Sequence, residues 1–264
     1  MSRVSFTEVW DQTRAFVVKE LPLLAPVALT CFAVPLLLLS MVMPPAPAVD
    51  APPPVGTWLL WPLPLFIIEI FGWLTLVALA LVPAISVGEA MRRALTRLPI
   101  ALGVLTVLIA AGFILLIGVG IVVAMMSMLA GSGKNATLSL TVALLVTVML
   151  VAMTRLSVLW PAVVDRHDGP LTTLRRALRL TAGEFWHLLG LLLLASAVSA
   201  LLSVTAQLAG GSLMLLLGRM VHNDALGRSL ALALNAVVVS LWQMVTVIYV
   251  AFLYRAFTRS GKAD

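Results

Sequence analysis

Glu69 is the residue whose type and surroundings most suggest chemistry, because it lies in an otherwise apolar segment. A charged group inside a membrane is costly, and it usually serves a function or has a polar partner. Three amides on later apolar segments lie at similar depth, namely Gln207, Asn235 and Gln243. We expect Glu69 to face other helices, either as a proton- or substrate-binding carboxylate or as a polar lock between helices.

Arg155 is a second charge within an apolar segment, about six residues before Pro161. Its long side chain can reach the membrane surface from there, and its depth differs from that of Glu69, so we expect no direct pair. The nearby segment 165–168 holds two carboxylates and an imidazole. Neighbouring residues in a turn converge poorly on one metal ion, so we interpret this segment as a helix end followed by a helix cap.

Common catalytic motifs are absent from the sequence, including Gly-x-Ser-x-Gly, Gly-x-x-x-x-Gly-Lys and His-Glu-x-x-His. We therefore predict no catalytic residue, no metal site and no cofactor. An intramembrane enzyme is the least favoured hypothesis.

The elements that position these residues follow from composition. The chain has 264 residues, of which 62% are hydrophobic and 11% charged, whereas soluble domains are about 45–50% apolar and about 25% charged. This excludes a soluble domain, and the high hydrophobicity excludes a disordered chain. Six stretches are long enough to cross a bilayer as helices. They are 21–43, 58–85, 99–129, 136–164, 185–208 and 226–254. The Gly-rich segment 209–212 is expected to end the fifth span, and 213–220 to form a short helix near the surface.

The net charge of +6 predicts orientation rather than a nucleic-acid partner. Of the 17 Lys and Arg residues, 14 fall on one side of these spans, and only Lys134, Arg219 and Arg228 fall on the other. Cytoplasmic loops carry the excess of Lys and Arg, so we expect an inner-membrane protein with both termini in the cytoplasm. The expected partners are membrane lipids, with other membrane proteins or a second copy as further candidates, and no nucleic acid.

Three amphipathic helices are predicted on the cytoplasmic side, within 6–17, 87–98 and 171–181. Ser5 with Glu8, and Ser86 with Glu89, form capping boxes. The apolar face of the second helix is expected to hold Val87, Met91, Ala94, Leu95 and Leu98. Such helices lie in the membrane interface with the apolar face toward the acyl chains, or equally they pack under the bundle and close its cytoplasmic side. The residues expected near lipid headgroups are Arg92, Arg93, Arg97, Arg175, Arg176 and Arg179.

These helices recur at intervals of 81 and 83 residues. We predict an all-α polytopic protein, with one integral membrane domain over 1–264. It contains three units (about 1–85, 86–168 and 169–264), each an amphipathic helix followed by a transmembrane hairpin.

Several motifs resemble the six-helix membrane-domain family named for glycerophosphoryl diester phosphodiesterases. The resemblance rests on Ser5 with Glu8, the segment 159–165, the segment 169–181, Phe185-Trp186 and Tyr254-Arg255. It implies a bacterial helical inner-membrane protein whose role is poorly defined. In some relatives such a domain precedes a phosphodiesterase domain. The chain is expected to lack that domain, because it stops about ten residues after the last span, so the activity is not carried over.

From these observations we expect a non-catalytic membrane protein that acts through lipid or protein contacts in envelope homeostasis. The alternative is a small transporter or permease that uses Glu69 and the polar residues of the bundle.

Overall fold

The computed structural model describes residues 5–43, 56–82, 84–130, 134–165, 169–181 and 184–259, and this part of the chain is helical without strands. Six helical stretches are long and apolar enough to cross a membrane, as the sequence predicts. They are Phe6–Val42, Pro62–Leu81, Val87–Met125, Thr141–Asp165, Phe185–Met220 and Asp224–Arg259. The fold class of a multi-span helical membrane protein is therefore confirmed.

The first span is a single helical run that includes the predicted amphipathic segment. Helix α1 (Phe6–Ala28) continues through a π-helical turn, η1 (Leu29–Ala33), into α2 (Val34–Val42). Ser5 caps α1, because its hydroxyl accepts the amide of Glu8 at 3.4 Å. The Pro-rich segment 44–55 lies outside the described residues. The chain returns through a short 3₁₀ turn, η2 (Thr57–Leu60), and α3 (Pro62–Leu81).

The second hairpin is made by α4 (Val87–Ala130) and α5 (Lys134–Leu156). The second predicted amphipathic segment forms the first turns of α4, and the Ser86–Glu89 capping box is reciprocal, with backbone-to-side-chain distances of 3.3 and 3.4 Å. A short helix, α6 (Leu159–Asp165), follows a break in α5. Pro161 explains the break, because it lacks the N–H that a continuous helix would donate to the carbonyl of Ser157.

The third hairpin corrects one expectation from the sequence. Helix α7 (Pro170–Leu180) is separate, as predicted, but α8 (Phe185–Thr205) runs through the π-helical η3 (Ala206–Gly211) into α9 (Ser212–Met220). The Gly-rich segment therefore does not end the helix. The return helix is α10 (Asp224–Arg259). At the turn the backbones of α9 and α10 touch, since a Cβ on Gly218 would lie 2.7 Å from Gly227 Cα. This close contact holds α9 against α10.

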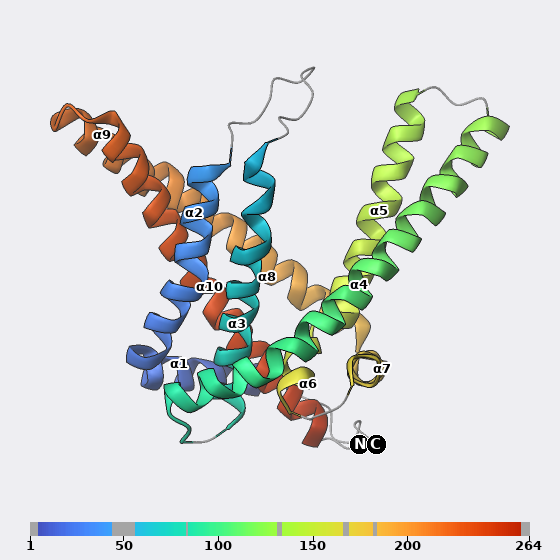
Figure 1. Ribbon diagram of the computed structural model, residues 1–264, viewed down its shortest axis with the longest axis horizontal. Coiled ribbons are helices and arrows are strands. Elements are labelled where there is room, and N and C mark those ends of the chain that lie inside the picture. Colours follow the sequence, from blue (N-terminus) through green and yellow to red (C-terminus); the bar gives the residue numbers. More distant parts are fainter. Residues whose placement is uncertain are drawn as a thin grey trace.

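The spans spread apart from one end of the molecule (Figure 1). The start of α1, helices α6 and α7, and the last turns of α10 gather at that end. The α4–α5 hairpin and the arm formed by α8, α9 and α10 lean away on opposite sides of α2 and α3. We call this gathering point the basic end, after its arginines Arg92, Arg93, Arg175, Arg176, Arg179 and Arg255.

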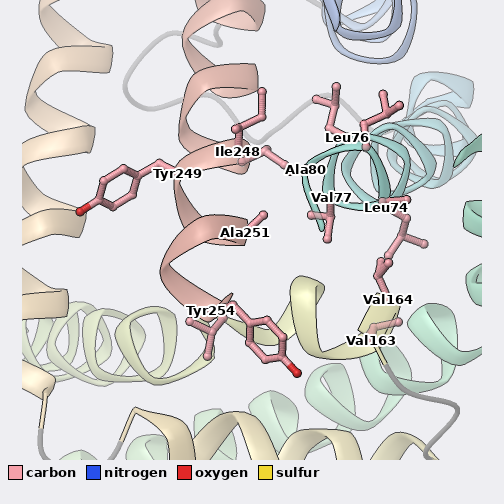
Figure 2. Close-up of a cluster of buried hydrophobic side chains, with 14 of the residues drawn as sticks. Leu74, Leu76, Val77, Ala80, Val163, Val164, Ile248, Tyr249, Ala251 and Tyr254 are labelled. Atoms are coloured by element: carbon pink, nitrogen blue, oxygen red, sulfur yellow. The ribbon is translucent and has the colours of Figure 1, made fainter. Parts of the chain in front are cut away.

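Helices α3, α6 and α10 form the centre of the packed core (Figure 2). Ile248 and Ala251 of α10 face the α3 side chains Val77 and Ala80, and α6 adds Val163. In its most apolar window α3 is 56% buried, whereas the corresponding windows of α4 and of α8–α9 are 6% buried. The outer helices therefore present apolar side chains to their surroundings, as lipid-facing helices must.

Candidate functional site

Glu69 of α3 has one side-chain partner in the described chain, and that partner is Gln243 of α10. The Gln243 amide Nε2 donates to Glu69 Oε1 over 2.6 Å, across two helices that pack along the core. Both residues are half-buried. Of the three predicted amide partners, Gln243 is thus the one that contacts Glu69. An isolated carboxylate among apolar groups is expensive, and this hydrogen bond lowers that cost.

Gln207 and Asn235, the other two predicted partners, belong to a separate polar chain. Gln207 Nε2 donates to Ser203 Oγ at 3.3 Å, and Ser203 Oγ donates to Asn235 Oδ1 at 3.1 Å. This chain joins α8 and η3 to α10. Ser203 was not predicted as a partner, although its position four residues before Gln207 places both on one helix face.

Arg155 stands at the end of α5 and joins it to the α7–α8 connection. Its Nη1 donates to the carbonyl of Thr181 at 3.3 Å, and its guanidinium lies 5.3 Å from the ring centre of Phe185. In return the Thr181 hydroxyl donates to the Arg155 carbonyl at 3.2 Å, a group left without its helical partner by the break in α5. The positive charge also lies near the carbonyl ends of two helices, where it is favourable. Arg155 and Glu69 have separate partners, as predicted.

Asp165 connects three elements at the basic end, which the sequence analysis did not predict. The Tyr254 hydroxyl donates to Asp165 Oδ2 at 2.8 Å, and Arg176 Nη2 lies 3.8 Å from the same oxygen. The Arg176 side chain is 13% exposed, so most of it faces other helices rather than the surface where lipid headgroups were expected. It belongs to a cluster that fastens α6, α7 and α10 together. His167 and Asp168, from the same sequence segment, lie outside the described residues.

Arg97 was also expected near lipid headgroups, but its side chain is buried against other helices, with 1% exposed. It shares one face of α4 with Ala90, Ala94, Ala101 and Val104, all fully buried. Small residues allow helices to approach closely in membranes, and they mark the packed side of α4. Of the predicted apolar face, Ala94 is buried and Val87 and Leu98 pack against the core, whereas Met91 and Leu95 are 40% and 61% exposed. The packed face of α4 therefore overlaps the predicted apolar face only in part.

The remaining predicted arginines are accessible at the basic end. Arg92, Arg175 and Arg179 are exposed, and Arg93 is partly exposed. Exposed Leu171 and Leu178 lie on the same helix as Arg175 and Arg179. An arrangement of guanidinium groups beside large apolar side chains suits the boundary between lipid headgroups and acyl chains.

Two hollows lie side by side at this end, and no sequence signal predicted them. The first is a cavity of about 230 Å³ between α1, α3 and α10, with Glu20 and Arg255 among mostly apolar lining residues. The second is an open depression of about 530 Å³ at the start of α4, lined by Glu89, Arg92 and Arg93 among others. The connection around Ala84 contributes to both. Neither hollow includes Glu69.

Within the described residues, no group of three or more His, Cys, Asp or Glu side chains is placed to hold a metal ion. Comparison with known proteins identifies no relative, since no family model, curated protein or solved structure matches the chain. The resemblance to the phosphodiesterase-associated membrane domain therefore stays a prediction.

Proposed function

We propose that the chain is a non-catalytic protein of a bacterial inner membrane that acts through lipid and protein contacts at its basic end, in envelope homeostasis. The observation that carries this proposal is the surface formed by Arg92, Arg175 and Arg179. These guanidinium groups are exposed, and large exposed apolar side chains such as Leu95 and Leu178 lie on the same helices. Anionic headgroups attract arginines near the membrane surface by about 1 kcal/mol each.

The same surface supports a cytoplasmic location for the basic end. The start of α1 and the end of α10 lie together there (Figure 1), so both termini share one side of the membrane under this proposal. The excess of arginine predicts that this side is the cytoplasm. A membrane-impermeant thiol reagent tests the orientation. It should label Val221→Cys but not Arg259→Cys in intact cells carrying Cys31→Ala, and the reverse pattern would overturn the proposed orientation.

Transport through Glu69 is the alternative function. A transported solute or proton needs a path to the carboxylate, but Glu69 is engaged by Gln243 and the two hollows at the basic end do not include it. These contacts favour a polar lock between α3 and α10. Loss of uptake into vesicles on Glu69→Gln would instead support transport.

Lipid analysis of membrane discs excised with an amphipathic polymer tests the main proposal. Discs that contain the wild-type chain should be enriched in anionic phospholipid relative to the bulk membrane. Replacement of Arg92, Arg175 and Arg179 together by Gln should remove most of that enrichment. Replacement of Arg219 and Arg228, near the opposite end, by Gln is the matched control and should leave it intact. Equal lipid composition in wild-type, triple-variant and bulk samples would refute the proposal.

A further inference from the structure

The cavity between α1, α3 and α10 combines an apolar lining with charge at its edge. Phe16 and Leu24 of α1, Leu79 of α3 and Phe252 of α10 line it, and Arg255 lies at the end of the same helix as Phe252. Its volume of about 230 Å³ is below the roughly 300–1,000 Å³ of sites that enclose a whole small molecule. The cavity therefore suits one part of a larger amphiphilic molecule.

Charge around the two hollows favours an anion. Within the described chain, the guanidinium groups of Arg92, Arg93 and Arg255 make no hydrogen bond or ion pair. The two carboxylates that share the lining are engaged elsewhere. Glu20 lies 3.6 Å from Lys19 Nζ, and Glu89 accepts the backbone amide and the hydroxyl of Ser86 in the capping box. An incoming phosphate would therefore meet guanidinium groups that are still available.

The backbone between the two hollows is itself unusual. Ala84 has φ of 57°, a left-handed conformation that costs a non-glycine residue energy and that clusters at ligand sites. This residue lies on the wall that both hollows share, at the inner end of α3. It stands between the end of α3 at Leu81 and the start of α4 at Val87.

We propose that these adjoining hollows bind one anionic phospholipid, with the first part of an acyl chain in the cavity and the phosphate among Arg92, Arg93 and Arg255. The site deepens the proposed function, because it turns a general preference for anionic lipid into one saturable position. The site requires both an acyl chain and a headgroup of net negative charge. Free phosphate lacks the chain and a zwitterionic lipid lacks the net charge, so neither satisfies the site.

Native mass spectrometry of the delipidated full chain in mild detergent tests this site. Titration with dipalmitoyl phosphatidylglycerol should saturate at one lipid per chain. Arg93→Gln and Arg255→Gln should each weaken binding about fivefold, the loss expected for one arginine near a headgroup. Arg259→Gln, an exposed position one turn further along α10, is the matched control and should bind like the wild type.

A steric pair of variants tests the acyl-chain part of the site. Ala80→Phe fills the cavity and should abolish saturable binding. Leu23→Trp, at a lining residue that is 48% exposed, fills it from the edge and covers the case in which Ala80→Phe fails to fold. Dipalmitoyl phosphatidylcholine, glycerol phosphate and inorganic phosphate should not displace the bound lipid.

Three results would overturn the site: binding that never saturates, equal affinities for the Arg255→Gln and Arg259→Gln variants, or displacement of the lipid by inorganic phosphate. If excised discs are still enriched in anionic lipid in that case, the site fails and the proposed function stands. If the discs show no enrichment, the proposed function fails as well.

Discussion

The hydrogen bond from Gln243 to Glu69 shows what single residues in the membrane contribute. The two side chains are 174 positions apart in sequence, so only the packing of α3 against α10 brings them together. The sequence predicted that Glu69 needs a polar partner, since an apolar surrounding makes that requirement general. It left three candidates open on two helices. Choosing among them requires knowing which helix packs against α3 and how that helix is rotated, and sequence periodicity does not define the rotation of a helix that is apolar nearly all round.

A double-mutant cycle tests this pair. Removing either side chain, with Glu69→Leu or Gln243→Leu, should show a coupling of about 0.5–1.7 kcal/mol in the free energy of unfolding, the range for hydrogen bonds between membrane helices. The measurement is unfolding by sodium dodecyl sulfate in mixed micelles. The matched cycle of Glu69→Leu with Asn235→Leu should be additive within about 0.5 kcal/mol, because Asn235 belongs to the other polar chain. Additivity in the Glu69–Gln243 cycle would contradict the lock.

Helix faces are the level at which sequence reasoning was least accurate. The Ser86–Glu89 capping box and the Ser5 cap of α1 agree with the structure, because they depend on local hydrogen bonds. The packed face of α4 agrees only in part with the predicted apolar face, since Arg97 and a row of alanines occupy it while Met91 and Leu95 are exposed. In water large apolar residues turn inward, but lipid removes that preference, and close approach of small residues decides instead.

Gly72 shows such an approach between α3 and the π-helical turn of the first span. A Cβ at this position would overlap Cys31 Cβ and lie 2.9 Å from Phe32 Cε1. Gly72→Ala should therefore lower the free energy of unfolding by about 1–3 kcal/mol, the usual cost of overpacking. Thermal unfolding in nanodiscs measures the change. Gly112→Ala on α4, where a Cβ would meet nothing within 4 Å, is the control and should cause no loss. Equal unfolding temperatures for the two variants would contradict the tight contact.

At the scale of the whole molecule, the sequence predicts the number of spans and the all-helical class, because a helix needs about 20 apolar residues to cross a bilayer. How the hairpins are placed does not follow. The sequence predicted three similar units, yet the amphipathic segments of α1 and α4 continue directly into their spans while α7 is a separate helix. Asp165, Tyr254 and Arg176 fasten the ends of three helices, and no local pattern marks them as neighbours. The two hollows also depend on long-range packing, because α1, α3, α4 and α10 line them.

The most direct test of the central claim is an electron cryo-microscopy map of the full chain in nanodiscs of native lipid, with a bound antibody fragment for alignment. The lipid account predicts headgroup density against Arg92, Arg93 and Arg255, with an acyl chain entering the cavity beside Phe252, and Glu69 closed off by Gln243. A map with no ordered lipid at the basic end and a water-filled passage that reaches Glu69 would contradict the account and favour transport.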